Sequence, residues 1–459
     1  MSPKDCADHR HPASFRDMRS FLLPAAIALV TSTAFAETPP AIRAEVTARV
    51  DKEFTSLEAL YRELHAAPEL SFHEEKSGAR LAGEMRALGW EVAEKVGGHG
   101  VVAVLRNGAG PTVLVRCDTD ALPVREVTGV PFASKVMTKD DEGRDVPVMH
   151  ACGHDMHMTC WTGAARVLTA LRERWKGTLV FIAQPAEEKG AGAEAMLKDG
   201  LFTRFPKPDL CLALHVNSEL PAGTIGVTEG PTTANVDSLD ILVHGVGGHG
   251  AQPQSTKDPI VLAAQLVLAL QTIDSREIHP LEPVVVTVGS IHGGTKHNII
   301  PDSVKLQLTV RTYTDEVRAK TLAAIERIAR GLAIAAGLPE ALMPEVNRPE
   351  GFVPVTYNDP ALTRRLAGTF RTWFGEAQVR ERKPSMGGED FGQFGRTAEK
   401  IPVCMFVIGA VDPARVAEAE KSGDPLPSLH SPFFAPPVEP TLKTGVSALT
   451  AALLETLGR

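Results

Sequence analysis

The stretch Thr178-Leu-Val-Phe-Ile-Ala-Gln-Pro-Ala-Glu-Glu188 decides the fold class of this chain. Its first half is an apolar run typical of a strand buried on both faces, and two carboxylates follow it. The same order recurs twice, because Asp118 follows the β-rich run 112–116 and His215 follows the apolar run 210–214. Ligands bind at the carboxyl ends of strands in open α/β sheets, so these groups are predicted to meet in one pocket.

Helical patterns separate the predicted strands. Periodic apolar residues indicate helices over 50–65, 74–88 and 159–175. This alternation predicts an α/β fold with a doubly covered, largely parallel sheet. Asn107-Gly-Ala-Gly-Pro111 is a hairpin signal, so the run 101–105 is expected to pair with the run 112–116.

The pattern changes between residues 234 and 347. Elements are predicted there in the order β-α-β-β-α, over 238–244, 259–273, 284–291, 303–312 and 315–336. That order, with room for one more strand, resembles a ferredoxin-like α+β module. Candidate ligands resume only after it, at Gly387-Gly-Glu-Asp-Phe391 and Leu429-His430, so residues 234–347 are predicted to be an inserted domain. The first domain then comprises residues 37–233 and 348–459.

Composition narrows the class of partner. The 459 residues carry a formal net charge of -8 and contain no long Lys/Arg cluster. Phosphate binding needs a concentrated basic face, so we expect no nucleic-acid partner and favour a small-molecule substrate.

The N-terminus has the pattern of a secretory signal peptide. Arg19 precedes the apolar run 21–30, and Ala34-Phe-Ala36 offers the small residues that a signal peptidase requires. Residues 1–36 are therefore predicted to be a signal peptide, with Met1 or Met18 as the start. No later apolar run reaches the roughly 18 residues of a membrane span, so we expect an exported, periplasmic or secreted protein without a membrane anchor.

A cluster of metal-ligand residue types suggests the chemistry. Cys152 and His154 lie in Met149-His-Ala-Cys-Gly-His154, and the pair Glu187-Glu188 can supply one ligand plus one general base. These groups predict metal-assisted hydrolysis. Glu188 has an alternative role as the N-terminal cap of a helix near residue 191. Taken alone, histidines such as His215 and His430 are more often ordinary hydrogen-bonded residues.

The other cysteines do not form a disulfide framework. Cys117, Cys211 and Cys404 lie in or beside apolar runs, where a free thiol is typically a small buried hydrophobe.

Six ordered motifs resemble the M20 metallopeptidase family. They are Arg116-Cys-Asp-Thr-Asp-Ala-Leu-Pro123, Met149-His-Ala-Cys-Gly-His-Asp155, Gln184-Pro-Ala-Glu-Glu188, Gly247-Gly-His-Gly-Ala-Gln-Pro253, His297-Asn-Ile-Ile-Pro301 and Gly387-Gly-Glu-Asp-Phe391. More narrowly, the chain is similar to the amidohydrolase branch of hippurate, N-acyl-amino-acid and auxin-conjugate hydrolases. The resemblance covers nearly all of residues 45 to 455.

The resemblance implies a two-metal centre. Its ligands would be Cys152, which bridges the two ions, His154, Glu188, His215 and His430. Glu187 would be the general base, and Asp118 would orient a ligand from behind. Zinc, nickel, cobalt and manganese all remain open as the two divalent ions per chain.

The resemblance also assigns roles within the inserted domain. That domain would dimerise and present His249 to the active site of the partner subunit, where it polarises the scissile carbonyl. Asn298 and Arg311 would bind the substrate carboxylate.

We therefore expect an exported, homodimeric, metal-dependent amidohydrolase that cleaves N-acyl or aryl-acyl amino acids. A dipeptidase or carboxypeptidase on the same two-metal scaffold is the enzymatic alternative. A metal-dependent binding protein without turnover is the alternative from another class, and the intact Glu187 argues against it.

Overall fold

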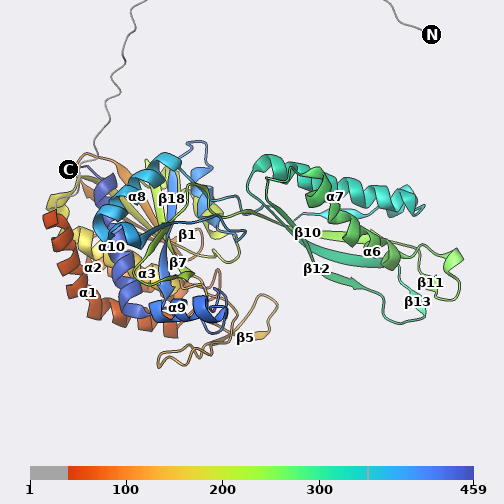
Figure 1. Ribbon diagram of the computed structural model, residues 1–459, viewed down its shortest axis with the longest axis horizontal. Helices are drawn as coiled ribbons and strands as arrows, with labels where there is room; N and C mark the ends of the chain where they lie inside the picture. The colour runs from red at the N-terminus through yellow and green to blue at the C-terminus, as the bar shows by residue number, and fades with distance from the viewer. Residues whose placement is uncertain (1–39, 349–350, 459) are drawn as a thin grey trace, which may run out of the picture. The chain divides into compact units, whose positions relative to one another are not determined.

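The computed structural model describes residues 40–348 and 351–458 (Figure 1), so the predicted signal peptide lies outside the described residues. The helices are α1 (Pro40–Ala66), α2 (Glu75–Ala87), α3 (His154–Ala170), α4 (Gly192–Lys198), α5 (Leu201–Arg204), α6 (Pro259–Leu270), α7 (Asp315–Ala335), α8 (Pro360–Phe374), α9 (Pro413–Ser422) and α10 (Val438–Thr456). Within the described ranges, none of these helices combines the length and the apolar character of a membrane span.

The strands form two main sheets. The first contains β1 (Glu91–Val96), β2 (Gly100–Asn107), β3 (Thr112–Asp118), β6 (Gly177–Gln184), β7 (Leu210–Pro221), β8 (Ile225–Val227), β17 (Val379–Glu381) and β18 (Val403–Val411). The second contains β10 (Asn235–His244), β12 (Val284–Gly293), β14 (Ser303–Thr312) and β15 (Glu345–Asn347). Short two-stranded pairs join β4 (Met137–Lys139) to β5 (Asp145–Pro147), β11 (Gly248–His249) to β13 (Ile299–Ile300), and β9 (Gly230–Pro231) to β16 (Tyr357–Asn358).

The eight-stranded sheet has the order β1-β2-β6-β3-β7-β18-β8-β17. Its centre is parallel, because β3 pairs in parallel with both β6 and β7, and β7 pairs in parallel with β18. The predicted α/β class with a largely parallel sheet is confirmed. The predicted hairpin between β2 and β3 is wrong, since β6 inserts between them and pairs antiparallel to β2.

Helices cover both faces of this sheet. Side chains of α1, α2, α3, α8 and α10 pack on one face with alternate strand residues such as Val101, Val113 and Phe181. Side chains of α4 and α5 pack on the other face with the intervening residues, such as Val102 and Leu114. Burial on both faces explains why β3 and β6 are apolar along nearly their whole length.

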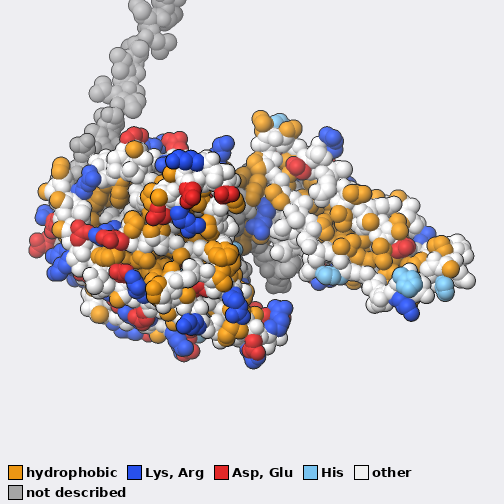
Figure 2. Space-filling model, turned by 60° about the horizontal axis from the view of Figure 1, so that its bottom comes forward, with side chains coloured by type: hydrophobic (Ala, Val, Ile, Leu, Met, Phe, Trp, Pro, Cys, Tyr) orange, Lys and Arg blue, Asp and Glu red, His pale blue; other side chains and the backbone are white. Residues whose placement is uncertain are grey.

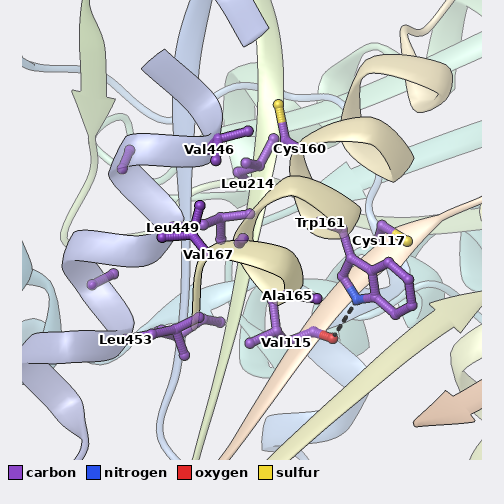
Figure 3. Packing of buried hydrophobic residues seen from close by; sticks show 14 of the residues in the cluster. Val115, Cys117, Cys160, Trp161, Ala165, Val167, Leu214, Val446, Leu449 and Leu453 are labelled. Carbon is purple, nitrogen blue, oxygen red and sulfur yellow. Dashed lines mark hydrogen bonds between the residues drawn. The ribbon is translucent and has the colours of Figure 1, made fainter. Parts of the chain in front are cut away.

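The close packing of α3 against α10 fixes the helix that begins at the candidate site. Figure 3 shows Cys160 and Val167 of α3 near Val446 and Leu449 of α10, while the ring of Trp161 points to the other side of α3. The Trp161 indole nitrogen donates a hydrogen bond to the carbonyl of Val115 at 3.3 Å, which ties α3 to β3. The five cysteines of the described residues are free and buried, which confirms the prediction for Cys117, Cys211 and Cys404.

The inserted domain has its own sheet and core. Its antiparallel strands run in the order β12-β14-β10-β15, and β10 pairs with β14 without a register shift from Asn235 to His244. Asp258 caps α6 and Thr314 caps α7, and apolar side chains of both helices pack against the sheet. The predicted ferredoxin-like order is confirmed with β15 as the additional strand, while the domain boundaries at 234 and 347 stay a prediction.

Candidate metal centre

Three strands of the parallel sheet bring polar groups to one edge. Asp118 is the last residue of β3 and pairs in register with Gln184, the last residue of β6. Glu187 and Glu188 follow three and four residues later. His215 differs from the sequence expectation, because β7 does not end before it but continues to Pro221.

The turn that carries the two glutamates is held from behind. Ala186 has a φ of 50°, a left-handed conformation that costs a residue with a Cβ about 1 kcal/mol or more. The buried Glu74 carboxylate accepts the Ala186 N–H at 2.7 Å and the Phe72 N–H at 2.9 Å. Glu74 immediately precedes α2, yet its side chain makes no cap hydrogen bond to that helix. It stabilises the turn before Glu187 instead.

Cys152 and His154 lie on either side of a glycine that the packing requires. Gly153 has a φ of 79°, and a Cβ placed there would lie 2.6 Å from a methyl carbon of Val216. His154 begins α3, and its Nδ1 lies 2.8 Å from the backbone carbonyl of Asp120. Because Nδ1 donates to that carbonyl, Nε2 carries the lone pair that a metal needs.

The predicted ligands come together as groups of donor atoms. Donor atoms of Cys152, Glu188 and His430 lie within 4.8 Å of one another, and so do those of Asp118, His154, His157 and His215. Cys152 Sγ lies 3.6 Å from His215 Nε2, and His430 Nε2 lies 3.5 Å from a carboxylate oxygen of Glu188.

Two of these atoms show that the set suits a cation. His154 Nε2 and Glu188 Oε1 are buried and lack a hydrogen-bond partner among the described residues, and they lie 3.8 Å apart. Unpaired buried acceptors are costly unless a cation or a donor satisfies them. A thiol, imidazoles and a carboxylate are ligands that divalent transition metals prefer, so the residues fit a metal centre.

His157 behaves differently from its neighbours. Its Nδ1 lies 2.6 Å from Asp118 Oδ1, and its Nε2 accepts the backbone N–H of Val216 at 2.9 Å. Both ring nitrogens are therefore engaged by protein groups, which makes His157 a structural residue rather than a ligand. Asp118 also places its second oxygen 3.6 Å from His154 Nε2, so its carboxylate borders the donor atoms.

A buried arginine balances the carboxylates behind the site. Arg116 contacts Asp118 at 2.5 Å, Glu389 at 2.8 Å and Asp390 at 3.3 Å. Burial alone would raise the pKa of Asp118, but Arg116, His154 and His157 together outweigh it and hold that pKa well below the usual range. Burial raises the pKa of Glu187 well above its ordinary value, and Glu389 raises it further.

The alternative role of Glu188 as a helix cap does not occur. The N-terminal N–H of Ala193 in α4 donates to Asp390 at 2.9 Å instead. Asp390 also accepts a hydrogen bond from Gln184 at 2.7 Å, so it joins the chain segment near residue 390 to the end of β6.

A pocket of about 790 Å³ opens onto these residues. Its lining includes Cys152, Glu187, Glu188, His215, His430 and, from β14, Arg311. The other two predicted residues of the inserted domain, His249 and Asn298, are not among its lining residues. They lie together on the exposed β11–β13 pair, where the Gly250 N–H donates to the Asn298 carbonyl at 2.9 Å.

Sequence patterns gave no role to several residues of this region. Glu74 and Arg382 contact or line the site without belonging to a quoted motif, and Glu389 lies in the motif 387–391 but had no role assigned to it. Arg116 did carry a signal, because a cation in an apolar strand two residues before an aspartate faces the same side as that aspartate.

The parallel sheet and the donor cluster at its edge define the class of the protein as a metal-dependent hydrolase. Residues 114–455 match the family model described as peptidase family M20/M25/M40. The chain is 36% identical over 397 residues to thermostable carboxypeptidase 2 of Saccharolobus solfataricus, covering 86% of this chain and 93% of that one. It is 36% identical over 342 residues to the hippurate hydrolase of Campylobacter jejuni, covering 73% and 84%.

The structure is also similar to that of the Bacillus subtilis YxeP protein, described as a dinuclear metal binding peptidase of the M20 family. The TM-score is 0.70 at 30% sequence identity, with 89% of this chain and 100% of that one covered. The chain therefore belongs to the M20 peptidase family, and its relatives place it in the amidohydrolase branch.

Proposed function

We propose that the protein hydrolyses the amide bond of N-acyl or aryl-acyl amino acids. The observation that carries this proposal is the presence of Arg311 in the same pocket as the donor cluster. Its guanidinium donates to Thr309 at 3.0 Å and to the Met386 carbonyl at 3.4 Å, and it forms no ion pair with a carboxylate of the described residues. A substrate carboxylate would supply the missing partner. Asn298 does not line this pocket and lies beside His249, so we propose that it assists in binding the substrate carboxylate in the partner's site.

We assign Cys152, His154, Glu188, His215 and His430 as ligands of two divalent metal ions, with Cys152 as the bridge. Cys152 suits a bridge because its sulfur lies beside His215 and groups with Glu188 and His430. When bound, such ions polarise a carbonyl group and lower the pKa of a water molecule. Manganese, zinc, nickel and cobalt are all compatible with this donor set.

Glu187 is the proposed general base. Its carboxylate lies 3.8 Å from His154 Nε2 and lines the pocket, which supports a role toward a water molecule that the metals would hold. Glu187 accepts the proton of the attacking water and passes it to the leaving nitrogen. Glu187→Gln should retain the metals and lose about 10² to 10⁴ in kcat. Near-normal turnover of that variant on N-acetyl amino acids would remove Glu187 from the mechanism.

We propose that the protein is a homodimer formed through the inserted domain. Most of the exposed large hydrophobic side chains of the described residues belong to that domain, including Ile260, Val261 and Leu268 of α6. Figure 2 shows hydrophobic side chains gathered on one face of that domain. The edge strand β12 is ten residues long and adds the exposed Ile291. A long unpaired edge beside an apolar helix face favours association with a second copy.

His249 is proposed to act in the partner's site, because it is exposed on β11 and does not line the pocket of its own chain. Its removal should cost about 2.7 to 4 kcal/mol of transition-state stabilisation, as for other oxyanion donors. Mixing His249→Ala with Glu187→Gln protomers should restore one intact site per heterodimer. If differentially tagged heterodimers form and remain inactive, the cross-subunit role is wrong.

A dipeptidase or carboxypeptidase activity is the second candidate, since a relative at 36% identity carries the name carboxypeptidase. Arg311 suits the C-terminal carboxylate of a peptide equally well. A panel of N-acetyl amino acids and free dipeptides on the metal-loaded protein separates the two activities. We also propose that the protein is exported, which N-terminal sequencing of the mature chain tests.

A further inference from the structure

Arg382 is a second arginine in the pocket that lacks a close partner. Its side chain is 22% exposed, and its one ion-pair contact among the described residues is Glu219 at 3.6 Å, whose side chain is 77% exposed. Arg318 has the same 22% exposure, but it makes two hydrogen bonds to Asp237 at 2.6 and 2.7 Å. A half-buried guanidinium is normally paired in this way. The guanidinium of Arg382 therefore has N–H groups that lack an acceptor among the described residues.

Neighbouring strand residues hold the side chain of Arg382 in a defined position. Its backbone N–H donates to the Val227 carbonyl at 2.8 Å, and its carbonyl accepts the Thr228 hydroxyl at 3.2 Å. A Cβ at Gly226 would lie 2.5 Å from Cδ of Arg382, so the aliphatic stem crosses this strand where no side chain stands in its way. The position of the guanidinium is therefore built by the sheet.

The strand register gives the distance from Gly226, where the Arg382 side chain crosses the strand, to the proposed metal ligand His215. Gly226 of β8 pairs with Val407 of β18, and Val407 pairs with His215 of β7. Neighbouring strands lie about 4.8 Å apart, so Gly226 is about 10 Å from His215 across the sheet. A substrate whose scissile carbonyl lies at the proposed metal ligands can therefore reach the Arg382 guanidinium with a short side chain.

The charges that line the pocket indicate which chemical group this side chain of the substrate can carry. Glu187 and Glu188 belong to the proposed metal centre, and Glu389 is paired with Arg116. The exposed Glu219 is therefore the one acidic lining residue of the described chain beside Arg382, and it leaves the charge of that arginine available to a substrate anion. We propose that Arg382 forms a second anion subsite and that the preferred substrates are N-acyl amino acids with a second carboxylate. Arg382 binds this second carboxylate while Arg311 binds the α-carboxylate, an arrangement that rests on the proposed amidohydrolase function.

Matched substrate pairs test the subsite. N-acetyl-Glu against N-acetyl-Gln places the second charge on the amino acid, and N-succinyl-Ala against its half-amide, N-succinamoyl-Ala, places it on the acyl group. We expect the metal-loaded enzyme to prefer the charged member of one pair by tenfold or more in kcat/KM, about the effect of one charge-assisted hydrogen bond. Arg382→Gln should bring that ratio close to one, and Arg382→Lys should give an intermediate ratio.

Lys383→Gln is the matched control, because it removes the neighbouring exposed charge and should leave the ratio unchanged. Ratios close to one for both pairs in the unmodified enzyme, or a ratio that survives in Arg382→Gln, would overturn the subsite. Calorimetric titration of the Glu187→Gln holoprotein with the same four compounds measures the preference in Kd. The subsite is thereby tested even if no N-acyl amino acid is hydrolysed, a result that would refute the proposed function alone.

Discussion

The buried histidine His65 of α1 should make the stability of the protein depend on pH. Its Nδ1 lies 2.6 Å from Asp155 and its Nε2 lies 3.1 Å from Glu126, while the ring of Phe132 packs edge-on against it. Burial alone would lower the pKa of His65, but the two carboxylates outweigh this effect and raise the pKa to about 10. Asp155 directly follows the proposed ligand His154, so this ion triad also anchors the start of α3.

The size of the effect follows from linkage. The pKa moves from 6.5 to about 10, and at about 1.4 kcal/mol for each pH unit this corresponds to roughly 5 kcal/mol. Breaking one partner of a buried ion pair costs about 3 to 5 kcal/mol, which agrees. Because the pKa is raised in the folded state, the stabilisation is complete below pH 6.5 and is lost as the pH rises towards 10.

Urea unfolding of the metal-loaded protein, followed by tryptophan fluorescence between pH 6 and pH 10, measures this loss. His65→Gln cannot take up the proton, so its unfolding midpoint should lie far below that of the unmodified protein at pH 6 and approach it at pH 10. His73→Gln is the control, because the His73 side chain is 60% exposed and its nearest carboxylate is 4.0 Å away. A constant difference between His65→Gln and the unmodified protein over this pH range would refute the reasoning.

Four further substitutions have defined outcomes. Cys152→Ala should bind fewer than two metals per chain by elemental analysis, and retention of both would contradict the bridge. Glu74→Ala should lower kcat about tenfold through misplacement of the Glu187 turn, and adding Ala186→Gly, which adopts a positive φ without strain, should recover part of the loss. Gly445→Ala should lower the free energy of unfolding by about 1 to 3 kcal/mol, because its Cβ would lie 2.3 Å from a buried thiol of α3. Gly368→Ala, with open space around it in α8, should instead stabilise by about 0.5 to 1 kcal/mol.

Much of the fold follows from local pattern. The sequence runs of β3 and β6 are mostly apolar and that of β14 alternates, so the sequence predicts all three strands and also the more exposed side of β14. The pairing of the strands is harder to predict from the sequence, as the loop 107–111 illustrates. Its glycines and proline do mark a turn, but β6 supplies parallel partners for β3 that no nearby residue indicates.

The residues of the candidate site also differ in how well the sequence predicts them. Cys152, His154 and the Glu187-Glu188 pair stand out because their residue types are unusual beside apolar strands. Glu74 and Arg382 do not stand out, since an acid before a helix and a base after a strand are common. Their roles depend on where the chain folds back on itself, which brings Glu74 to Ala186 and Arg382 to Gly226.

The contacts of Arg116 bear on how the enzyme acquires its activity. Arg116 contacts Asp118, Glu389 and Asp390 and offsets part of their mutual repulsion, so contacts within the protein hold these three carboxylates together. Folding and metal loading should consequently be separate events, and chelation should abolish turnover while leaving the cooperative unfolding transition in place. A scaffold of this kind can be refilled with a different ion after it has folded. The metal found in any preparation would then depend on which ions were available when the site was loaded. Substrate preference would be best compared after deliberate refilling with each ion in turn.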